Sequence, residues 1–481
     1  MFWLLVAVVA GAHVAVLWQS IFIVRLWEDE AFNLTVPLNV LRGLGYTSDG
    51  TLSGSELTSF DPRISTGPVV LLPIAAVMAT GIDAIIAGRL TVAAFYIALL
   101  VGVAIVGRRI AGPWAALAAV TVPLAIDTTK GFSPIQGPAD ILGEIPVAAL
   151  CVWAIVVLRR HLWMAGLLLG FAIQAKYIAI LFIPAFVVAS WLRDRALPPR
   201  ERLRALILPA ALVVAPTAVV ELTAMFALGP AGFVDHLRRT AGFLRSGGQS
   251  YAPTTVIEKV TTLTESWFLP PALVALVIVG AIAVCAAALI IVRRDPTRLR
   301  DGVIVASRRE LLGLAIVCVG GLMTFLGWWS FAAHLPLWIR HPSPALFALA
   351  PIAAAFLVLS LRVLGTRAAV AGGLVLAMML GIAAGAHVRQ AWAGAANETL
   401  ADQRSTAAQL AALGGDMYAA QWGGPVSIVV ISGAHVGLWD AGDHVADWPR
   451  LLTAVTGECE PPLITIGAYA VCAPTSLPPA G

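Results

Sequence analysis

The stretch Trp27-Glu28-Asp29-Glu30-Ala31-Phe32-Asn33 follows directly after the first long apolar run, residues 2–24. Three consecutive carboxylates are costly at membrane depth, where one charge costs about 2.5–3.5 kcal/mol on insertion scales. At the water interface the same acids are tolerated, and a carboxylate there can accept a proton from a reacting group. The stretch therefore predicts that the chain leaves a membrane near residue 25 and carries a functional acid at that point.

The composition is that of a membrane protein. Of the 481 residues, 59% are hydrophobic and 12% are charged, and the mean hydropathy is +0.88. A soluble chain carries about 25% charged residues. Many apolar runs approach or exceed the about 20 residues that a helix needs to cross a bilayer. Because the first run lacks a basic flank and a small-residue cleavage pattern, we expect a retained span and not a cleaved signal peptide.

Arginine clusters predict the orientation, because loops rich in Lys and Arg stay in the cytoplasm. These clusters are Arg108-Arg109, Arg159-Arg160, residues 193–204, residues 293–309, and Arg362 with Arg367. Placing all of them inside predicts eleven spans, at residues 2–24, 86–107, 112–126, 139–158, 162–175, 177–192, 205–228, 269–292, 310–332, 345–361 and 368–387.

This topology predicts two domains. Residues 1–387 would form an all-α polytopic domain in a bacterial plasma membrane, with a cytoplasmic N-terminus. Its outer loop, residues 25–85, contains an apolar piece at 66–80 that we expect to lie along the interface without crossing it. Residues 388–481 would form an extracytoplasmic domain.

The polar C-terminal segment reads as a small mixed α/β domain. A helical segment at 397–413 precedes apolar runs at 426–431 and 463–466, which are separated by Gly-, Pro- and Asp-rich turns. About ninety residues are enough for a modest core. A disulfide between Cys459 and Cys472 is one option in an oxidising compartment, and two unpaired thiols are the other.

Histidines in the same segment offer a weaker signal. His435 and His444, with Asp440 and Asp443, could bind a metal, although a solvated loop is the commoner outcome for such a set.

Acidic residues on the expected outer face suggest acid–base chemistry. Asp29 with Glu30 could deprotonate a hydroxyl, which contributes about 10²–10⁴-fold to a rate, or could mark the end of a helix in water. Asp140 and Glu144 are four residues apart and would share one helix face. They could position an acceptor, hold a cation, or form ion pairs with Lys130 or Lys176.

Basic residues on the same face could bind an anion. Lys176 interrupts two short apolar runs, and Arg340-His341 directly precedes the span at 345–361. Arginine binds phosphate in a bidentate manner and keeps its charge. Arg63 is a further candidate for the same task, and Arg340 could instead be an interfacial residue without a ligand.

Motifs of several other chemistries are absent from the sequence. There is no G-x-x-x-x-G-K-[ST] loop, no H-E-x-x-H and no paired C-x-x-C. A nucleotide-sugar site is therefore unsupported, and we expect no nucleic-acid partner.

Several short motifs follow one another along residues 1–360. They are Asp29-Glu30 after the first span, residues 66–73 at the end of the first loop, Gly88-Arg89-Leu90, residues 107–112, Pro138-Ala139-Asp140, residues 166–176, and Arg340-His341 before Pro344-Ala345-Leu346. In this order the chain resembles the GT-C membrane glycosyltransferases, in the branch of bacterial protein O-mannosyltransferase-like and aminoarabinose-transferase-like enzymes.

The resemblance implies a polyprenyl-phosphate-linked sugar as donor and Asp29 as the general base of an inverting transfer. It also implies outer-face Arg or Lys side chains on the lipid phosphate. Some members bind a divalent cation near the acidic loop, which here would be Mg²⁺ or Mn²⁺ at Asp29, Glu30 and Asp140. Thr66-Gly67-Pro68 replaces the commoner His/Lys-Pro-Pro form. That change removes a basic group and leaves the phosphate to Arg63, Lys176 or Arg340, the last with its neighbour His341.

Together these features predict an enzyme that transfers a mannose- or arabinose-type sugar to a cell-envelope glycan, glycolipid or protein on the outer face. One alternative is a transporter or flippase of polyprenyl-linked glycans, which would favour two related halves that the sequence does not show. Another is a non-catalytic membrane scaffold whose outer domain binds a partner.

Overall fold

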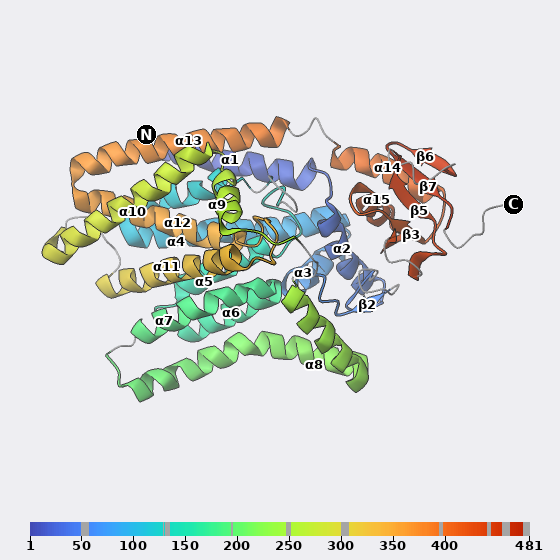
Figure 1. The fold of residues 1–481 in the computed structure, drawn as a ribbon, viewed down its shortest axis with the longest axis horizontal. Helices are drawn as coiled ribbons and strands as arrows, with labels where there is room; N and C mark the ends of the chain where they lie inside the picture. Colours follow the sequence, from blue (N-terminus) through green and yellow to red (C-terminus); the bar gives the residue numbers. More distant parts are fainter. Residues whose placement is uncertain are drawn as a thin grey trace.

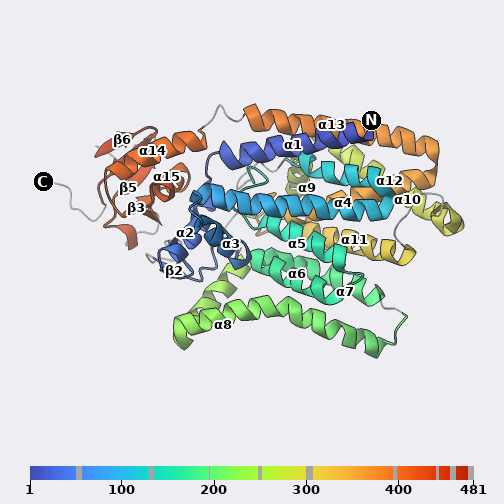
Figure 2. The ribbon, with the colours of Figure 1, turned by 180° about the vertical axis from the view of Figure 1, so that it is seen from behind.

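The computed structural model describes residues 1–49, 57–127, 129, 135–193, 196–246, 252–299, 307–393, 398–439, 444–454 and 462–474. A bundle of helices makes up most of the molecule, and a small sheet lies beyond one end of it (Figure 1). We call this end of the bundle the sheet end. Seen from behind, α2 and α3 lie between the bundle and the sheet (Figure 2).

Seven helices in the described part of the chain are long and apolar enough to cross a membrane. They are α1 (Phe2–Phe22), α4 (Ala84–Ala125), α8 (Pro199–Ser246), α10 (Pro271–Arg294), α11 (Arg308–Phe331), α12 (Ser343–Leu364) and α13 (Thr366–Ala393). Shorter apolar helices are α3 (Pro68–Met78), α5 (Glu144–Val157), α6 (Leu162–Ala175) and the consecutive η2 (Tyr177–Phe182) and α7 (Ile183–Arg193). The chain is a multi-pass membrane protein, and the predicted all-α membrane fold is confirmed.

The predicted count of eleven spans is not confirmed. The expected spans 86–107 and 112–126 both fall within α4, which is broken at Ala111 and Gly112. The expected spans at 139–158, 162–175 and 177–192 fall on α5, α6 and the η2–α7 pair, which are short. Two further short helices, α9 (Val256–Glu265) and η3 (Pro296–Leu299), were not predicted.

A glycine bends α8 at the sheet end, so that its last part turns back toward the bundle. Gly229 has φ 68° and ψ 173° and precedes Pro230, so the helix changes direction there. The predicted span 205–228 ends at this bend. The remainder of α8 then runs toward α3 (Figure 1) and brings Phe243 and Leu244 to the sheet end.

The first outer loop is more helical than the sequence predicted. The interfacial piece expected at 66–80 is α3, whereas α2 (Glu28–Leu41) was not expected. The three acids occupy the first turn of α2, where the helix dipole stabilises negative charge. Glu30 caps this turn by accepting a hydrogen bond from the backbone N–H of Trp27 (3.1 Å). A two-stranded ribbon, β1 (Thr47–Ser48) and β2 (Thr58–Ser59), follows.

The C-terminal region is a small mixed α/β unit, as predicted. Its sheet has the order β4-β3-β5-β7-β6, in which β3 pairs parallel to β4 and β5, and β7 pairs antiparallel to β5 and β6. The elements are α14 (Leu400–Ala412), β3 (Met417–Ala420), α15 (Gly424–Ser432), β4 (His435–Leu438), β5 (Arg450–Thr453), β6 (Ile464–Ile466) and β7 (Tyr469–Cys472).

Three residues named from the sequence, Asp440, Asp443 and Cys459, lie outside the described residues, as does Lys130. The predicted disulfide and the predicted pairing of Lys130 therefore stay predictions.

Hydrogen bonds fasten this C-terminal unit to the first outer loop. Gln403 of α14 accepts from the Leu26 N–H (2.6 Å) and donates to the Leu26 carbonyl (3.0 Å). Asp49, after β1, accepts from the Val436 N–H (2.9 Å) and lies 3.1 Å from His435 Nδ1. His435 thus contacts the first loop, and the residues immediately before Asp29 are held from the C-terminal side.

Candidate active site

A cavity of about 440 Å³ lies at the sheet end, where segments distant in the sequence meet. The residues that line it come from the first outer loop, η2, the end of α8, α11, the segment before α12 and the C-terminal unit. They are Asp29, Arg63, Ser65, Lys176, Tyr177, Ile178, Ile180, Leu181, Phe243, Leu244, Trp328, His334, Leu335, Trp338, Arg340, His341 and Trp422. Asp29 is the one acid among these lining residues, which include three basic side chains, Arg63, Lys176 and Arg340.

Asp29 contacts a cation directly. Its carboxylate forms an ion pair with the Arg340 guanidinium, and the two side chains are 22% and 12% exposed. The guanidinium also lies over the rings of Trp338 (4.8 Å) and Trp27 (5.6 Å). These aromatic faces hold the guanidinium in place while the carboxylate neutralises part of its charge. The arrangement joins the predicted base to one of the predicted phosphate ligands.

Lys176 forms a buried ion pair with Glu144. It follows the last residue of α6, and its Nζ lies 2.5 Å from Glu144 Oε1. Gly143 allows this approach, because a Cβ there would lie 2.5 Å from the Ala175 carbonyl oxygen. Of the three roles considered for Glu144, the geometry therefore supports the ion pair with Lys176. Lys176 also lines the cavity.

Asp140 and Glu144 do not share a helix face, so that expectation was wrong. The helix α5 begins at Glu144, and Asp140 lies in the preceding turn because Gly137-Pro138 and Gly143 interrupt the helix. Asp140 is 1% exposed, and its Oδ2 accepts from the Gln136 N–H (2.5 Å). Burial and the nearby Glu30 carboxylate raise the pKa of Asp140 well above its ordinary value.

Glu30 faces away from the cavity and binds Arg89. Arg89 Nε and Nη2 donate to the two carboxylate oxygens of Glu30 at 3.1 and 2.8 Å, and both side chains are fully buried. Arg89 also donates to the carbonyls of Val24 (2.7 Å) and Arg25 (2.8 Å). Glu30 further accepts from the Ile141 N–H (3.0 Å). This network fixes the end of α1, the start of α2 and the Asp140 turn relative to one another.

His341 and Arg63 complete the polar lining. Burial, together with the charges of Arg340, Lys176 and Lys259, lowers the pKa of His341 well below its ordinary value, so the imidazole is neutral at neutral pH. Its Nδ1 is buried and makes no hydrogen bond within the described part of the chain. Arg63 is exposed and donates its backbone N–H to Asp61 (2.9 Å).

The acids named as possible metal ligands do not converge. Asp29 pairs with Arg340, both oxygens of Glu30 bind Arg89, and Asp140 does not line the cavity. Across the described ranges, no group of three His, Cys, Asp or Glu side chains could hold a metal ion. These residues as they stand do not fit a resident divalent cation, and no step below is derived through one.

Several lining residues were not predicted from the sequence. Tyr177, Ile180 and Leu181 of η2 form an apolar wall with Phe243 and Leu244. Ile180 and Leu244 are 47% and 56% exposed. The sequence did not indicate these residues, because an apolar residue that faces a cavity cannot be distinguished in the sequence from one that faces lipid.

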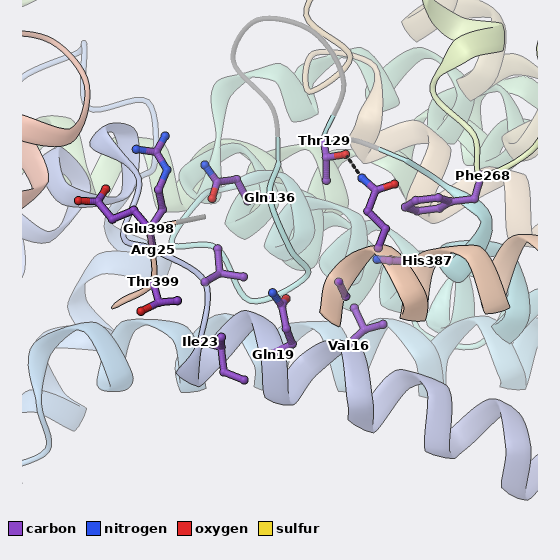
Figure 3. Close-up of a pocket in the computed structure, with 13 residues that line it drawn as sticks. Val16, Gln19, Ile23, Arg25, Thr129, Gln136, Phe268, His387, Glu398 and Thr399 are labelled. Carbon is purple, nitrogen blue, oxygen red and sulfur yellow. Dashed lines mark hydrogen bonds between the residues drawn. The ribbon is translucent and has the colours of Figure 1, made fainter. Parts of the chain in front are cut away.

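A second cavity, of about 290 Å³, lies between the end of α1, α13 and the Asp140 turn. Figure 3 shows Gln19, Gln136, Thr129 and His387 around it, with Gln390 donating to Thr129 (2.9 Å). None of the predicted site residues lines this second cavity. The first cavity is therefore the candidate active site.

Comparison with solved structures identifies the fold. ArnT from Cupriavidus metallidurans bound to undecaprenyl phosphate superposes with a TM-score of 0.57 at 14% identity, covering 98% of each chain. ArnT in the apo state gives 0.55 at 12% identity, covering 97% of each.

The apo oligosaccharyltransferase from Archaeoglobus fulgidus gives 0.54 at 11% identity, covering 92% of this chain and 65% of that one. The same oligosaccharyltransferase has also been solved in complex with Zn and sulfate. No protein-family model and no curated protein sequence matches the chain. The chain has the fold of the GT-C membrane glycosyltransferases, so the predicted resemblance is confirmed at the level of fold.

Proposed function

We propose that the protein is an integral membrane glycosyltransferase that takes a sugar from a polyprenyl-phosphate donor, with Asp29 as the general base. The observation that carries the proposal is the cavity itself. Among the described residues that line it, Asp29 is the one acid, and Arg63, Lys176 and Arg340 line it as well, next to an apolar wall. This combination suits a ligand with an anionic head, a hydroxyl to be deprotonated nearby and a hydrocarbon tail.

The chemistry is a single displacement at the anomeric carbon. Asp29 takes the proton of the acceptor hydroxyl, and the oxygen lone pair attacks the anomeric carbon. The bond from that carbon to the phosphate oxygen breaks, and its electron pair leaves with the lipid phosphate. The configuration at the anomeric carbon therefore inverts. Lys176 and Arg63 stabilise the charge on the leaving phosphate.

Arg340 would exchange partners when the donor binds. In the structure its guanidinium pairs with Asp29. A phosphate oxygen competes with the carboxylate for this guanidinium, because arginine binds both anions by the same fork. Donor binding would thus release Asp29 to accept a proton, and we expect the donor to bind before the acceptor.

Neutral His341 offers a hydrogen bond in place of a charge. Its buried Nδ1, which has no partner in the described ranges, is available to a phosphate oxygen as a donor or to a sugar hydroxyl as an acceptor.

We assign Glu30 and Asp140 to positioning, not to direct catalysis. Glu30 is held by Arg89 and directs the first turn of α2, on which Asp29 lies. Asp140 fixes the turn that follows Gln136 through its bond to that backbone N–H. Glu144 keeps Lys176 in place through their ion pair. A mannose- or arabinose-type sugar and a cell-envelope glycan, glycolipid or protein on the outer face remain our proposed donor sugar and acceptor, in a bacterial plasma membrane.

Sugar transfer by the purified protein tests the proposal. Protein in nanodiscs would receive synthetic polyprenyl-phospho-mannose, -arabinose and -glucose, with membrane extract as the source of acceptor. We expect release of polyprenyl phosphate and an inverted glycosidic linkage with one of the three donors. Replacing Lys176 or Arg340 should reduce donor binding, and replacing the exposed Arg238, which pairs with Asp235 and lies outside the cavity, should not.

Binding and transfer together separate the outcomes. If the folded protein neither binds undecaprenyl phosphate nor transfers any of the three sugars, the proposal is wrong. If it binds the lipid and moves it across a vesicle membrane without releasing sugar, the protein is a transporter.

A further inference from the structure

The C-terminal unit contributes an aromatic side chain to the candidate active site. Trp422 lines the cavity together with Asp29, although the two residues are almost four hundred positions apart in the sequence. The indole stacks on the ring of Phe32 in α2, with centroids 5.7 Å apart and planes at 13°. Phe32 lies three residues after Asp29 and therefore one helical turn further along α2. Trp422 is thus seated on the same helix as the proposed base, about one turn further along it.

The exposure of Trp422 argues for more than a packing role. Phe32 is 3% exposed, whereas Trp422 is 40% exposed. An indole that only filled the gap between α2 and the C-terminal unit would be buried like Phe32. Because one face of Trp422 lies against Phe32 and the residue lines the cavity, an open part of the indole is presented to whatever binds there.

The turn that carries Trp422 is rigidly held. It follows the carboxyl end of β3, which pairs parallel to both of its neighbours, and ligands of parallel sheets bind beyond such strand ends. The Gln421 N–H donates to the Leu451 carbonyl (3.0 Å), and the Gln421 side chain accepts from Thr453 (3.0 and 3.2 Å). Gly424 permits the tight approach of α15, because a Cβ there would lie 2.5 Å from the Tyr469 hydroxyl.

We propose that Trp422 is a substrate-binding residue on which a sugar ring stacks, and that the C-terminal unit thereby helps to select the sugar. Sugar rings carry a face of C–H groups that packs on the electron-rich face of an indole. The hydroxyls at the ring edge then meet Asp29, Ser65 and Arg63, which line the same cavity. This inference rests on the proposed glycosyltransferase function. The ring belongs to the donor or to the acceptor, and the test below separates these sources.

Binding measurements with Trp422→Leu and Trp422→Phe provide the test. Leucine keeps an apolar contact with Phe32 and removes the flat ring, whereas phenylalanine keeps a ring. Trp392→Leu is the matched control, because Trp392 is 46% exposed on α13 and does not line the cavity. Dissociation constants would be measured in nanodiscs for undecaprenyl phosphate and for undecaprenyl-phospho-mannose and -arabinose. Contacts of methyl mannoside and methyl arabinoside would be measured by saturation-transfer NMR with undecaprenyl phosphate bound.

If the donor sugar stacks on Trp422, the leucine variant binds the sugar-bearing lipid about tenfold more weakly and bare undecaprenyl phosphate equally well. If the acceptor sugar does, the methyl glycoside signal is lost and both lipids bind normally. In either case phenylalanine restores most of the binding and the Trp392 control behaves as wild type.

Two results would overturn the inference. One is unchanged binding of all probes by Trp422→Leu, and the other is equal weakening of both lipids, which indicates a structural role. If the wild-type protein binds none of the lipids, the proposed function fails as well, and this result is distinct from the other two.

Discussion

The buried pair of Glu30 and Arg89 makes a quantitative prediction about stability. Glu30→Gln removes the charge that compensates Arg89 while keeping nearly the same shape. Removing one partner of a buried ion pair costs about 3–5 kcal/mol, because the other charge is left without compensation. We expect Glu30→Gln to lower the free energy of unfolding by about 3 kcal/mol, at the low end of this range. The glutamine amide oxygen can still accept from the Trp27 or Ile141 N–H, as the carboxylate does now.

The corresponding change in melting temperature follows from the chain length. The entropy of unfolding is about 2.1 cal/mol/K per residue, which gives about 1 kcal/mol/K for 481 residues. A loss of about 1 kcal/mol in the free energy of unfolding therefore lowers the melting temperature by about 1 °C. The melting temperature of Glu30→Gln should therefore fall by about 3 °C. A thiol-reactive fluorogenic dye can report it in detergent, because Cys151 and Cys318 are free and buried in the folded protein.

Three further variants control this experiment, namely Glu28→Gln, Arg89→Met and the double variant of Glu30 and Arg89. Glu28→Gln changes the neighbouring acid, whose pKa is raised chiefly by burial and whose ion pair with Arg25 is long (3.7 Å), so neutralising it should cost little. Adding Arg89→Met to Glu30→Gln removes both charges, and the loss should be smaller than the sum of the single losses. The reasoning fails if Glu30→Gln melts like Glu28→Gln, or if the two losses add.

Four other predictions follow from named contacts. Asp140→Asn should raise the melting temperature at neutral pH and flatten its pH dependence. Because the pKa of Asp140 is raised in the folded state, this carboxyl group stabilises the fold at low pH, and the stabilisation is lost as the pH rises above the pKa of the unfolded state. An unchanged dependence of the melting temperature on pH would contradict this. The double variant Lys176→Met/Glu144→Gln should keep the fold, because it removes both charges of this buried pair. It should bind undecaprenyl phosphate about tenfold more weakly by calorimetry, and an unchanged affinity would show that Lys176 does not bind the phosphate. Gly67→Ala should abolish the folded yield by size-exclusion chromatography, because its Cβ would lie 2.0 Å from the Gln174 carbonyl oxygen, whereas Gly11→Ala, with open space around it, should not. Gln403→Ala removes two hydrogen bonds to Leu26 and should speed proteolytic release of the C-terminal unit; an unchanged cleavage rate would show that these bonds do not hold it.

The membrane helices were predictable because their signal is local. Long apolar runs gave α1, α10 and α11 close to their true bounds, and the apolar piece at 66–80 correctly indicated α3. The bend at Gly229 coincides with the predicted end of a span because Gly-Pro interrupts a helix in any context. The helix α2 was missed because it contains Pro37 and because its stability comes from tertiary contacts such as Glu30 with Arg89.

The site could be predicted only in part from the sequence. Charged residues at the ends of apolar runs are rare enough to be noticed, and Asp29, Lys176, Arg340, His341 and Arg63 do line one cavity. The ion pairs could not be predicted from the sequence. Glu30 and Arg89, for example, are 59 positions apart, and no rule of sequence spacing connects them.

Trp422 gave no signal that separates it from other tryptophans of the chain. Only the docking of the C-terminal unit on α2 brings it to the cavity. That docking depends on non-local contacts, such as Gln403 with Leu26, which sequence patterns do not reveal.

The most direct test of the account is single-turnover sugar transfer by Asp29→Asn beside wild type and Glu28→Gln. Glu28 is the neighbouring acid and does not line the cavity. With a donor that wild type uses, we predict that Asp29→Asn stays folded and loses about 10²–10⁴-fold in transfer rate. Its affinity for undecaprenyl phosphate should equal or exceed that of wild type, because no carboxylate competes for Arg340. Glu28→Gln should transfer at the wild-type rate. Transfer by Asp29→Asn at the wild-type rate would contradict the assignment of Asp29 as the base.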